Sequence, residues 1–139
     1  MIALTLPLSP TINHYYGQSR FKGRFIKPAG IAFRDAVIEI VIAAGYAVIT
    51  GRVHLMVAIH PATKRKQDLD NRIKSLQDAL THAGVWLDDE QIDVLHVERR
   101  EVMKGGLMRV VIFELDKQQN KTPASLERSG ASTNDTQGQ

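Results

Sequence analysis

The sequence predicts an α/β (α+β) domain with a mixed sheet of about four strands and two main helices. Two patterns support this prediction. Apolar residues that alternate with polar ones indicate strands, and apolar residues three and four positions apart indicate helices. Along the chain the patterns follow one another as strand, helix, strand, helix and a closing pair of strands. The order of the strands in the sheet does not follow from these patterns.

Composition indicates one globular domain. The chain has 139 residues, of which 43% are apolar and 24% charged, and this length suits a single core. We expect residues 1–116 to fold and residues 117–139, which are polar and contain one leucine, to form a disordered tail. No run of about 18 apolar residues could span a membrane, and the first residues lack the features of a signal peptide. A cytoplasmic protein is therefore expected.

Charge and cysteine content narrow the chemistry. The sequence has no cysteine, which excludes disulfides, thiolate metal sites and cysteine nucleophiles and leaves oxygen and histidine ligands. The five histidines show neither HxH nor HExxH spacing, so we do not expect them to bind metal. A net charge of +3 permits binding to nucleic acid without requiring it.

The chain opens with a predicted strand at residues 2–6, before Pro7. Residues 10–27 lack helical periodicity and are expected to form a loop in which aromatic and basic side chains are interleaved. Either the rings stack on nucleobases while the cations bind phosphates, or the rings fix the loop to the core while the cations face water. The residues concerned are Tyr15, Tyr16, Arg20, Phe21, Lys22, Arg24, Phe25 and Lys27.

The first helix is predicted to begin at Pro28, which suits a first helical position, and to end before Gly45. Its apolar residues extend well beyond one narrow face, so we expect it to be buried on two sides or to contribute to a subunit interface. The residues that widen the apolar face are Ile31, Ile38 and Ile42.

A second strand is predicted at residues 52–60, and its end leads through a basic run into an acidic segment. The basic residues are Lys64, Arg65 and Lys66. The following helix is expected over residues 69–83, because its apolar residues recur at steps of four, three, four and three up to Gly84. In such a helix Asp70 and Lys74 are one turn apart, so Lys74 should reach the same pocket as Asp70.

Two acidic clusters suggest a metal site. Asp68 and Asp70 flank one residue, and a second cluster of four acids follows Trp86. Mg²⁺ is typically held by one or two carboxylates, water and substrate phosphates, and such a site can hydrolyse a phosphodiester. Lys74 would add a fixed positive charge, while the flanking cations would bind a phosphate backbone. These cations are Lys64, Arg65, Lys66 and Arg72, and the second cluster comprises Asp88, Asp89, Glu90 and Asp93.

Each part of this pattern also has a purely structural explanation. An aspartate at the start of a helix is a common N-cap, and Asp70 with Lys74 could be an ordinary ion pair. The second cluster could be an acidic surface turn. Local sequence does not decide whether Asp88 or Asp89 points inward. Capping explains only one of the two aspartates at 68 and 70, which favours the metal site.

The last two strands are predicted at residues 91–102 and 107–115. The turn Lys104-Gly105-Gly106 between them indicates a hairpin. Residues 110–113 are consecutively apolar, which predicts cover on both faces of the final strand.

Several motifs together resemble the RusA family of Holliday junction resolvases. They are PTINHYY at residues 10–16, DLDN at 68–71 followed by Lys74, then DAL, AGVWLDDEQ and the KGG turn at 104–106. The resemblance extends from Pro10 to about Leu115. The first loop departs from the family pattern at Thr11, Ile12 and His14. The resemblance therefore says less about the function of this loop than about the acidic segments.

The resemblance implies a RusA-like fold and a site in which Asp68, Asp70 and Asp89 bind Mg²⁺, with Mn²⁺ as an alternative, and Lys74 is essential. It also implies a homodimer that cuts four-way DNA junctions by paired symmetric incisions in recombination and repair, in a bacterial, prophage or phage setting. It favours DNA contacts by the first loop. Two other functions remain open: a nuclease with a broader preference for branched DNA, and a basic DNA-binding module without catalysis.

Overall fold

Residues 1–115 are described by the structure, which is a computed structural model. The predicted tail at residues 117–139 lies outside them. Within residues 1–115 no helix is long and apolar enough to cross a membrane. The main elements in chain order are β1 (Ile2–Pro7), α1 (Ile12–Tyr15), β2 (Tyr16–Ser19), β3 (Gly23–Ile26), α2 (Pro28–Ala44), β4 (Val53–His60), α3 (Ile73–His82), β5 (Ile92–Arg99) and β6 (Leu107–Glu114).

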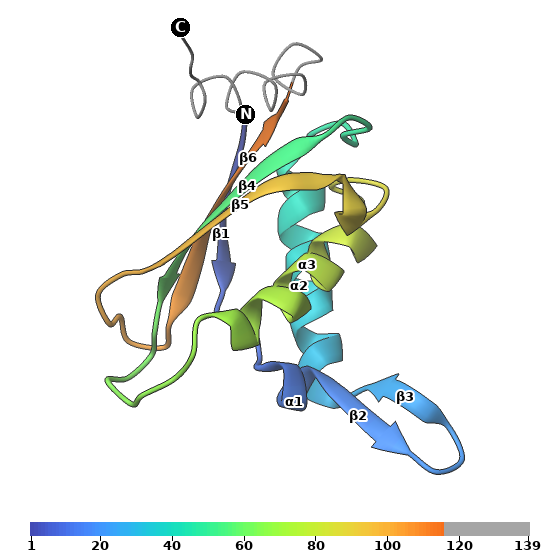
Figure 1. Ribbon diagram of the computed structural model, residues 1–139, viewed down its shortest axis with the longest axis vertical. Helices are drawn as coiled ribbons and strands as arrows, with labels where there is room; N and C mark the ends of the chain where they lie inside the picture. The colour runs from blue at the N-terminus through green and yellow to red at the C-terminus, as the bar shows by residue number, and fades with distance from the viewer. Residues whose placement is uncertain (116–139) are drawn as a thin grey trace, which may run out of the picture.

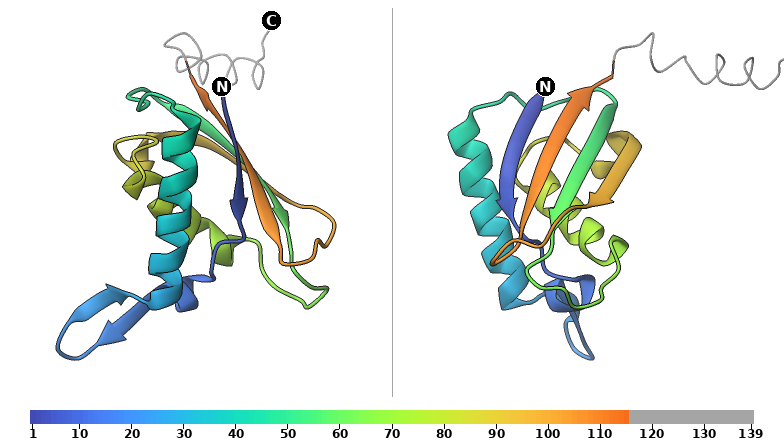
Figure 2. Two further views of the ribbon diagram at one scale, coloured as in Figure 1. Left: turned by 180° about the vertical axis from the view of Figure 1, so that it is seen from behind. Right: turned by 90° about the vertical axis from the view of Figure 1, so that its left-hand side faces the viewer.

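A four-stranded mixed sheet organises the molecule. Its strand order is β1-β6-β4-β5. Strand β6 runs antiparallel to β1 and β4, whereas β5 runs parallel to β4. Helices α2 and α3 lie on one side of the sheet (Figure 1), and the view onto the other side shows the strands without a covering helix (Figure 2, right). The predicted mixed sheet with two main helices is confirmed.

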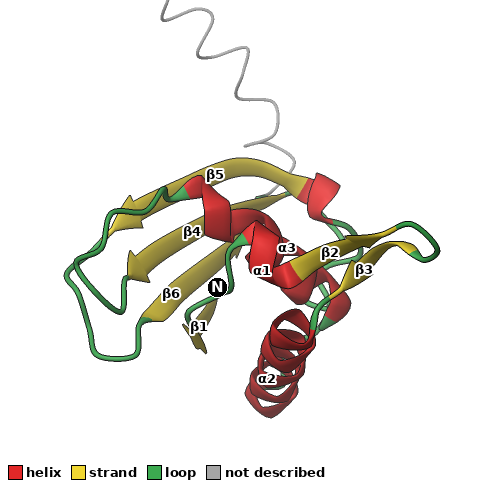
Figure 3. Ribbon diagram, turned by 90° about the horizontal axis from the view of Figure 1, so that it is seen from below, coloured by secondary structure: helices red, strands yellow, loops and turns green. Residues whose placement is uncertain are grey.

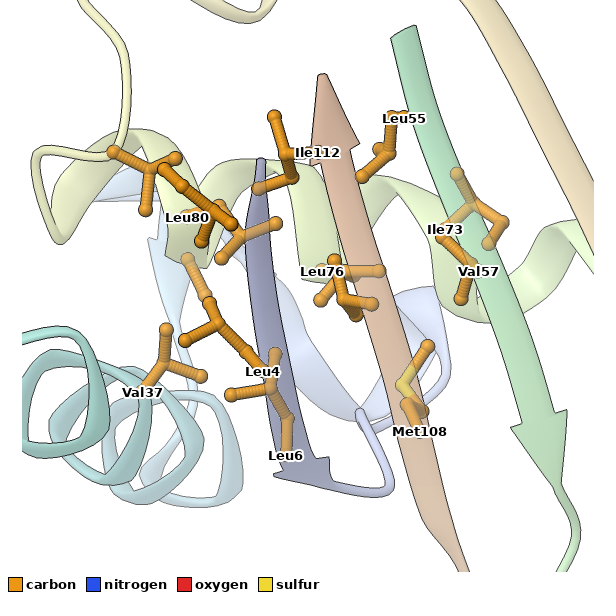
Figure 4. Packing of buried hydrophobic residues seen from close by; sticks show 14 of the residues in the cluster. Leu4, Leu6, Val37, Leu55, Val57, Ile73, Leu76, Leu80, Met108 and Ile112 are labelled. Atoms are coloured by element: carbon orange, nitrogen blue, oxygen red, sulfur yellow. The ribbon is translucent and has the colours of Figure 1, made fainter. Parts of the chain in front are cut away.

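The core fills the space between the sheet and the two helices. Strand β1 alternates buried and exposed residues along its whole length, as its sequence predicts. Strand β4 also directs alternate apolar residues toward the helices. Helix α3 adds a buried stripe, and α2 contributes Phe33 and Val37. Figure 4 shows side chains from these elements meeting in one cluster: Leu4, Leu6, Val37, Leu55, Val57, Ile73, Leu76, Leu80, Met108 and Ile112.

The segment 10–27 is more ordered than the predicted loop. It forms the short helix α1 and a two-stranded antiparallel ribbon, β2 with β3, separate from the main sheet. The ribbon projects away from the body of the molecule (Figure 1). Gly17 pairs with Phe25 across the ribbon, and a Cβ at Gly17 would lie 2.4 Å from the Phe25 ring. The ring therefore packs on a backbone that only glycine leaves open.

The predicted hairpin of the last two strands is wrong. Strands β5 and β6 lie on opposite sides of β4 and do not pair with each other. The connection crosses the end of β4, where the N–H of Arg100 donates to the carbonyl of Ile59 and the N–H of Met103 to that of Pro61, at 2.8 and 2.9 Å. A turn signal shows where the chain bends, but not which strands pair with the segments on its two sides. Here both β5 and β6 pair with β4.

Two predictions of extensive burial are also wrong within residues 1–115. Phe113, on the face of β6 away from the helices, is 36% exposed, because no described segment covers that face. On α2, Ile31 is 48% and Ile42 71% exposed, so the chain itself buries only one side of this helix. The alternative prediction, that α2 contributes to a subunit interface, stays open.

The core arrangement gives a testable difference between two nearby leucines. Leu80 is fully buried in α3, whereas Leu87 is 67% exposed. We expect Leu80→Ala to lower the free energy of unfolding by about 2–5 kcal/mol, because it leaves a cavity between helix and sheet. Leu87→Ala should change it by less than about 1 kcal/mol. Urea denaturation of both variants measures this, and equal losses would contradict the described packing.

Candidate active site

Lys74, on the first turn of α3, lies between two carboxylates. Its Nζ is 3.3 Å from Oδ1 of Asp78, one turn further along the helix, and 3.7 Å from Oδ2 of Asp89, which precedes β5. The three side chains line a pocket of about 390 Å³, to which Tyr15 of α1 and Arg34 of α2 also contribute. Figure 3, the view from below, shows α1 next to α3 on the side of the sheet that carries the helices. Because α3 buries its apolar stripe, Lys74 and Asp78 are left on the side that faces this pocket.

The four acidic residues that follow Trp86 make three different kinds of contact. Asp88 is the N-cap of a short 3-10 helix, and its Oδ1 accepts the N–H of Glu90 at 3.0 Å. Arg52 binds Glu90 and Asp93, at 3.1 and 2.6 Å, and its hydrogen bond lowers the pKa of Asp93. Asp89 alone of the four contacts Lys74. Of the two neighbouring aspartates, Asp89 is thus the one that contacts Lys74, although both line the pocket.

Gln91 fixes this acidic segment to the sheet. Its buried side-chain oxygen accepts the N–H groups of Leu87 and Asp88 at 2.8 and 3.0 Å. Its Nε2 donates to the carbonyls of Ile49 and Gly51, just before β4, at 3.0 and 2.8 Å. The side chain of one glutamine thereby replaces backbone pairing and sets the position of Asp89 relative to α3.

Trp86 supports the same segment from below. Its side chain is buried, and Nε1 donates to the hydroxyl of Thr81 on α3 at 2.7 Å. An isolated bridge also joins Trp86 to Ile49. Trp86 thus packs against α3 under the acidic segment, whereas its neighbour Leu87 is exposed.

Asp68 and Asp70 lie on the exposed approach to α3. The predicted continuous helix from Leu69 is wrong, because Asp70–Arg72 form a 3-10 turn and α3 begins at Ile73. The cause is at Arg72, whose backbone leaves ideal helical geometry (φ −109°, ψ −7°) and whose carbonyl accepts the Ser9 hydroxyl at 2.8 Å. Among the described residues Lys74 pairs with Asp78 and Asp89, so the alternative explanation, an ordinary ion pair of Asp70 with Lys74, is not supported.

Carboxylate chemistry at this site suits a hard cation. Burial, followed by the charge of Asp89, raises the pKa of Asp78 to about 6, although Lys74 is adjacent. Crowded carboxylates of this kind are stabilised by a bound divalent ion. Residues 1–115 nevertheless contain no group of three or more His, Asp or Glu side chains placed to hold a metal. Asp68 and Asp70 thus do not form one metal-binding group with Asp89 in the described residues.

Two groups of the residues predicted to contact DNA are exposed, and Lys27 belongs to neither. Arg20, Lys22 and Arg24 are exposed on the projecting ribbon, where the Arg24 guanidinium lies 3.8 Å from the centre of the Tyr16 ring. Lys64, Arg65 and Lys66 are exposed in the loop after β4. These side chains are free to meet a polyanion. Lys27, which is half-buried, donates from Nζ to the carbonyl of Asn13 at 2.8 Å.

Tyr15 and Arg72 do not support the contacts predicted for them. Tyr15 is fully buried, its hydroxyl has no hydrogen-bond partner among residues 1–115, and burial raises its pKa to about 12. A ring in that position cannot stack on a nucleobase. Arg72 is half-buried, and its guanidinium binds Gln67, at 2.9 Å, and the carbonyl of Ser9. It ties the approach to α3 to the end of β1.

Three pocket residues were missed by the sequence analysis. Asp78, Arg34 and His82 line the pocket with Lys74, and the Arg34 guanidinium contacts Nδ1 of His82. The available signal for Asp78 was its place one turn after Lys74. No local pattern could have paired Arg34 with His82, because 48 residues separate them.

Comparison with known proteins gives a consistent result. A family model described as Endodeoxyribonuclease RusA matches residues 7–113. The chain is 37% identical to Crossover junction endodeoxyribonuclease RusA of Shigella sonnei (strain Ss046) over 114 residues, which are 81% of this chain and 94% of that protein. It is 36% identical to the protein of that name from Escherichia coli (strain K12) over 114 residues, with the same coverage. The corresponding protein of Enterobacteria phage 82 is 36% identical over 113 residues, which are 81% of this chain and 93% of that protein.

The role of Gln91 can be tested by a substitution that keeps its size. Gln91→Leu leaves buried backbone N–H and C=O groups without partners, so we expect the free energy of unfolding to fall by at least about 2 kcal/mol. The same change at Gln77, a half-buried residue of α3, should alter it by about 0.5 kcal/mol. Guanidinium denaturation distinguishes the two, and an unaffected Gln91→Leu variant would show that this side chain does not anchor the segment.

Proposed function

Since the chain belongs to the RusA family of endodeoxyribonucleases, we propose that it resolves four-way DNA junctions. The proposed Mg²⁺ site is formed by Asp68, Asp70 and Asp89 and lies beside Lys74. The chain is an endodeoxyribonuclease, and the family resemblance inferred from its motifs is confirmed. The observation that carries the proposal for the site is the contact of Lys74 with Asp89, which places the second acidic segment beside the helix that follows Asp68 and Asp70.

Each residue has a distinct part in the proposed hydrolysis. The three aspartates supply oxygen ligands, which a hard cation prefers; Mn²⁺ fits the same donors. When bound, the cation polarises the scissile phosphate and neutralises the charge that develops on the leaving oxygen. Lys74 donates a hydrogen bond to a phosphate oxygen on which negative charge grows, and so stabilises the transition state more than the ground state.

Substrate binding is assigned to exposed cations outside the pocket. The ribbon of β2 and β3 and the loop after β4 both carry basic side chains, and these bind phosphates without reading sequence. We assign Tyr16 a supporting part, because its ring holds the Arg24 guanidinium and so positions that cation for a phosphate. The relatives come from bacteria and a phage, and we propose a bacterial or phage-infected cytoplasm as the setting.

A symmetric homodimer is proposed as the active species. Resolution of a four-way junction needs two incisions, whereas one chain supplies one Lys74 site, so two copies about a two-fold axis match the substrate. Helix α2 offers the surface, since Ile31 and Ile42 are exposed on it and Tyr46, just beyond its end, is 48% exposed. A helix whose apolar residues extend beyond its buried face has apolar surface left for a partner.

The carboxylates can be tested by neutral substitutions. We expect Asp68→Asn, Asp70→Asn and Asp89→Asn each to abolish cleavage of a labelled four-way junction in Mg²⁺ while binding it equally or more tightly, because repulsion of the phosphates is relieved. Glu101→Gln, at a side chain 79% exposed between β5 and β6, is the control and should cut normally. Normal cleavage by the Asn variants would refute the site, and equal cutting of a linear duplex would refute the preference for junctions.

The dimer can be tested by placing a charge on α2. Ile42→Glu should give a monomer in light scattering and should nick a supercoiled cruciform plasmid without converting it to linear product, because the second incision needs the second copy. Val102→Glu, at a residue 40% exposed outside α2, is the control and should stay dimeric. Dissociation by the Val102 variant alone would place the interface elsewhere, and a monomeric wild type would refute the dimer.

A further inference from the structure

We propose that Asp78 is a positioning residue, which holds the ammonium group of Lys74 beside Asp89 in the geometry needed for cleavage. The inference rests on the proposed function, in which Lys74 acts on the scissile phosphate. It adds a fourth acidic residue, with a role different from that of the three proposed ligands.

The contacts of Lys74 support this role. Asp78 approaches from the same helix at 3.3 Å and Asp89 from the segment before β5 at 3.7 Å, so the ammonium is held from two directions. Both carboxylates are 27% exposed and the lysine 47%. A lysine side chain has four rotatable carbon bonds, and a single exposed ion pair rarely fixes such a chain. Two partners on separate elements restrict it to a narrow set of positions.

Stability does not explain why Asp78 is there. In helical pairs four residues apart, an acid that precedes the lysine is more favourable than the order found here, in which Lys74 precedes Asp78. Its pKa of about 6, raised by burial and by Asp89, exceeds the unfolded value of 3.8. Such a group binds its proton more tightly in the folded state, so its ionisation at neutral pH opposes folding. A residue that costs stability is expected where activity requires it.

The neighbourhood limits what else Asp78 can contact. Within residues 1–115 its only cationic partner is Lys74, since Arg34 of the same pocket contacts His82. The backbone of α3 places Asp78 one turn from Lys74, and both lie on the side away from the core. An effect of Asp78 on the reaction should therefore pass through Lys74.

A double-mutant cycle tests this dependence. Asp78→Asn keeps the shape but removes the charge, and Lys74→Met removes the ammonium but keeps most of the chain length. With saturating junction and Mg²⁺, we expect Asp78→Asn to lower the single-turnover rate by roughly ten- to a hundredfold, since misplaced groups cost about that much. Junction affinity should be unchanged and the melting temperature equal or higher. In the Lys74→Met background, Asp78→Asn should cause no further loss of rate.

Two further variants complete the design. Asp78→Glu, whose longer side chain can still reach the ammonium, should recover most of the rate, and Glu101→Gln, at an exposed residue outside the pocket and α2, should match the wild type. If Asp78→Asn folds poorly, Asp78→Ser is measured in the same cycle with the same expected result.

Each contrary result has a definite meaning. Losses of equal size in both backgrounds would show that Asp78 acts independently of Lys74, and a strongly raised Mg²⁺ requirement would make it a metal ligand; either overturns the positioning role. A normal rate for Asp78→Asn alongside an inactive Asp89→Asn overturns this inference and leaves the proposed function intact. A wild-type chain that cuts no junction refutes both.

Discussion

The packing of α3 against the sheet is the constraint on which the site depends. Ile73, Leu76 and Leu80 are buried in the core, and this fixes the rotation of the helix about its axis. Because side chains four residues apart share one side of a helix, Lys74 and Asp78 are then directed to the pocket together. The hydrophobic burial that stabilises the domain thus also orients Lys74 and Asp78.

The acidic segment before β5 is held by polar contacts instead of apolar ones. Gln91 joins it to the residues before β4, and Arg52 binds Glu90 and Asp93, which leaves Asp89 for the pocket. Four neighbouring acids would repel one another, so distributing them among a cap, an arginine and a lysine lowers their mutual repulsion. The remaining excess charge, around Asp78 and Asp89, is where a cation would be favourable.

Rigid and exposed parts of the molecule divide the work in the proposed reaction. The pocket residues sit on α3 and on an anchored segment, which suits groups that must keep precise positions. The basic ribbon and the loop after β4 are exposed and project from the core (Figure 2), which suits contacts to a bent polyanion.

The sequence by itself determined the strands at residues 2–6 and 52–60, the helix from Pro28, the acidic and basic segments, and the family. These follow from periodicity and motifs, which depend on residues close together in the chain. Only the tertiary structure shows that β4 lies between β5 and β6 and that Tyr15 is buried. It also shows that Lys74 pairs with Asp78 and Asp89 and not with Asp70. Strand order and the direction of a carboxylate are set by contacts between distant segments, such as that of Gln91 with Ile49, and no local pattern encodes them.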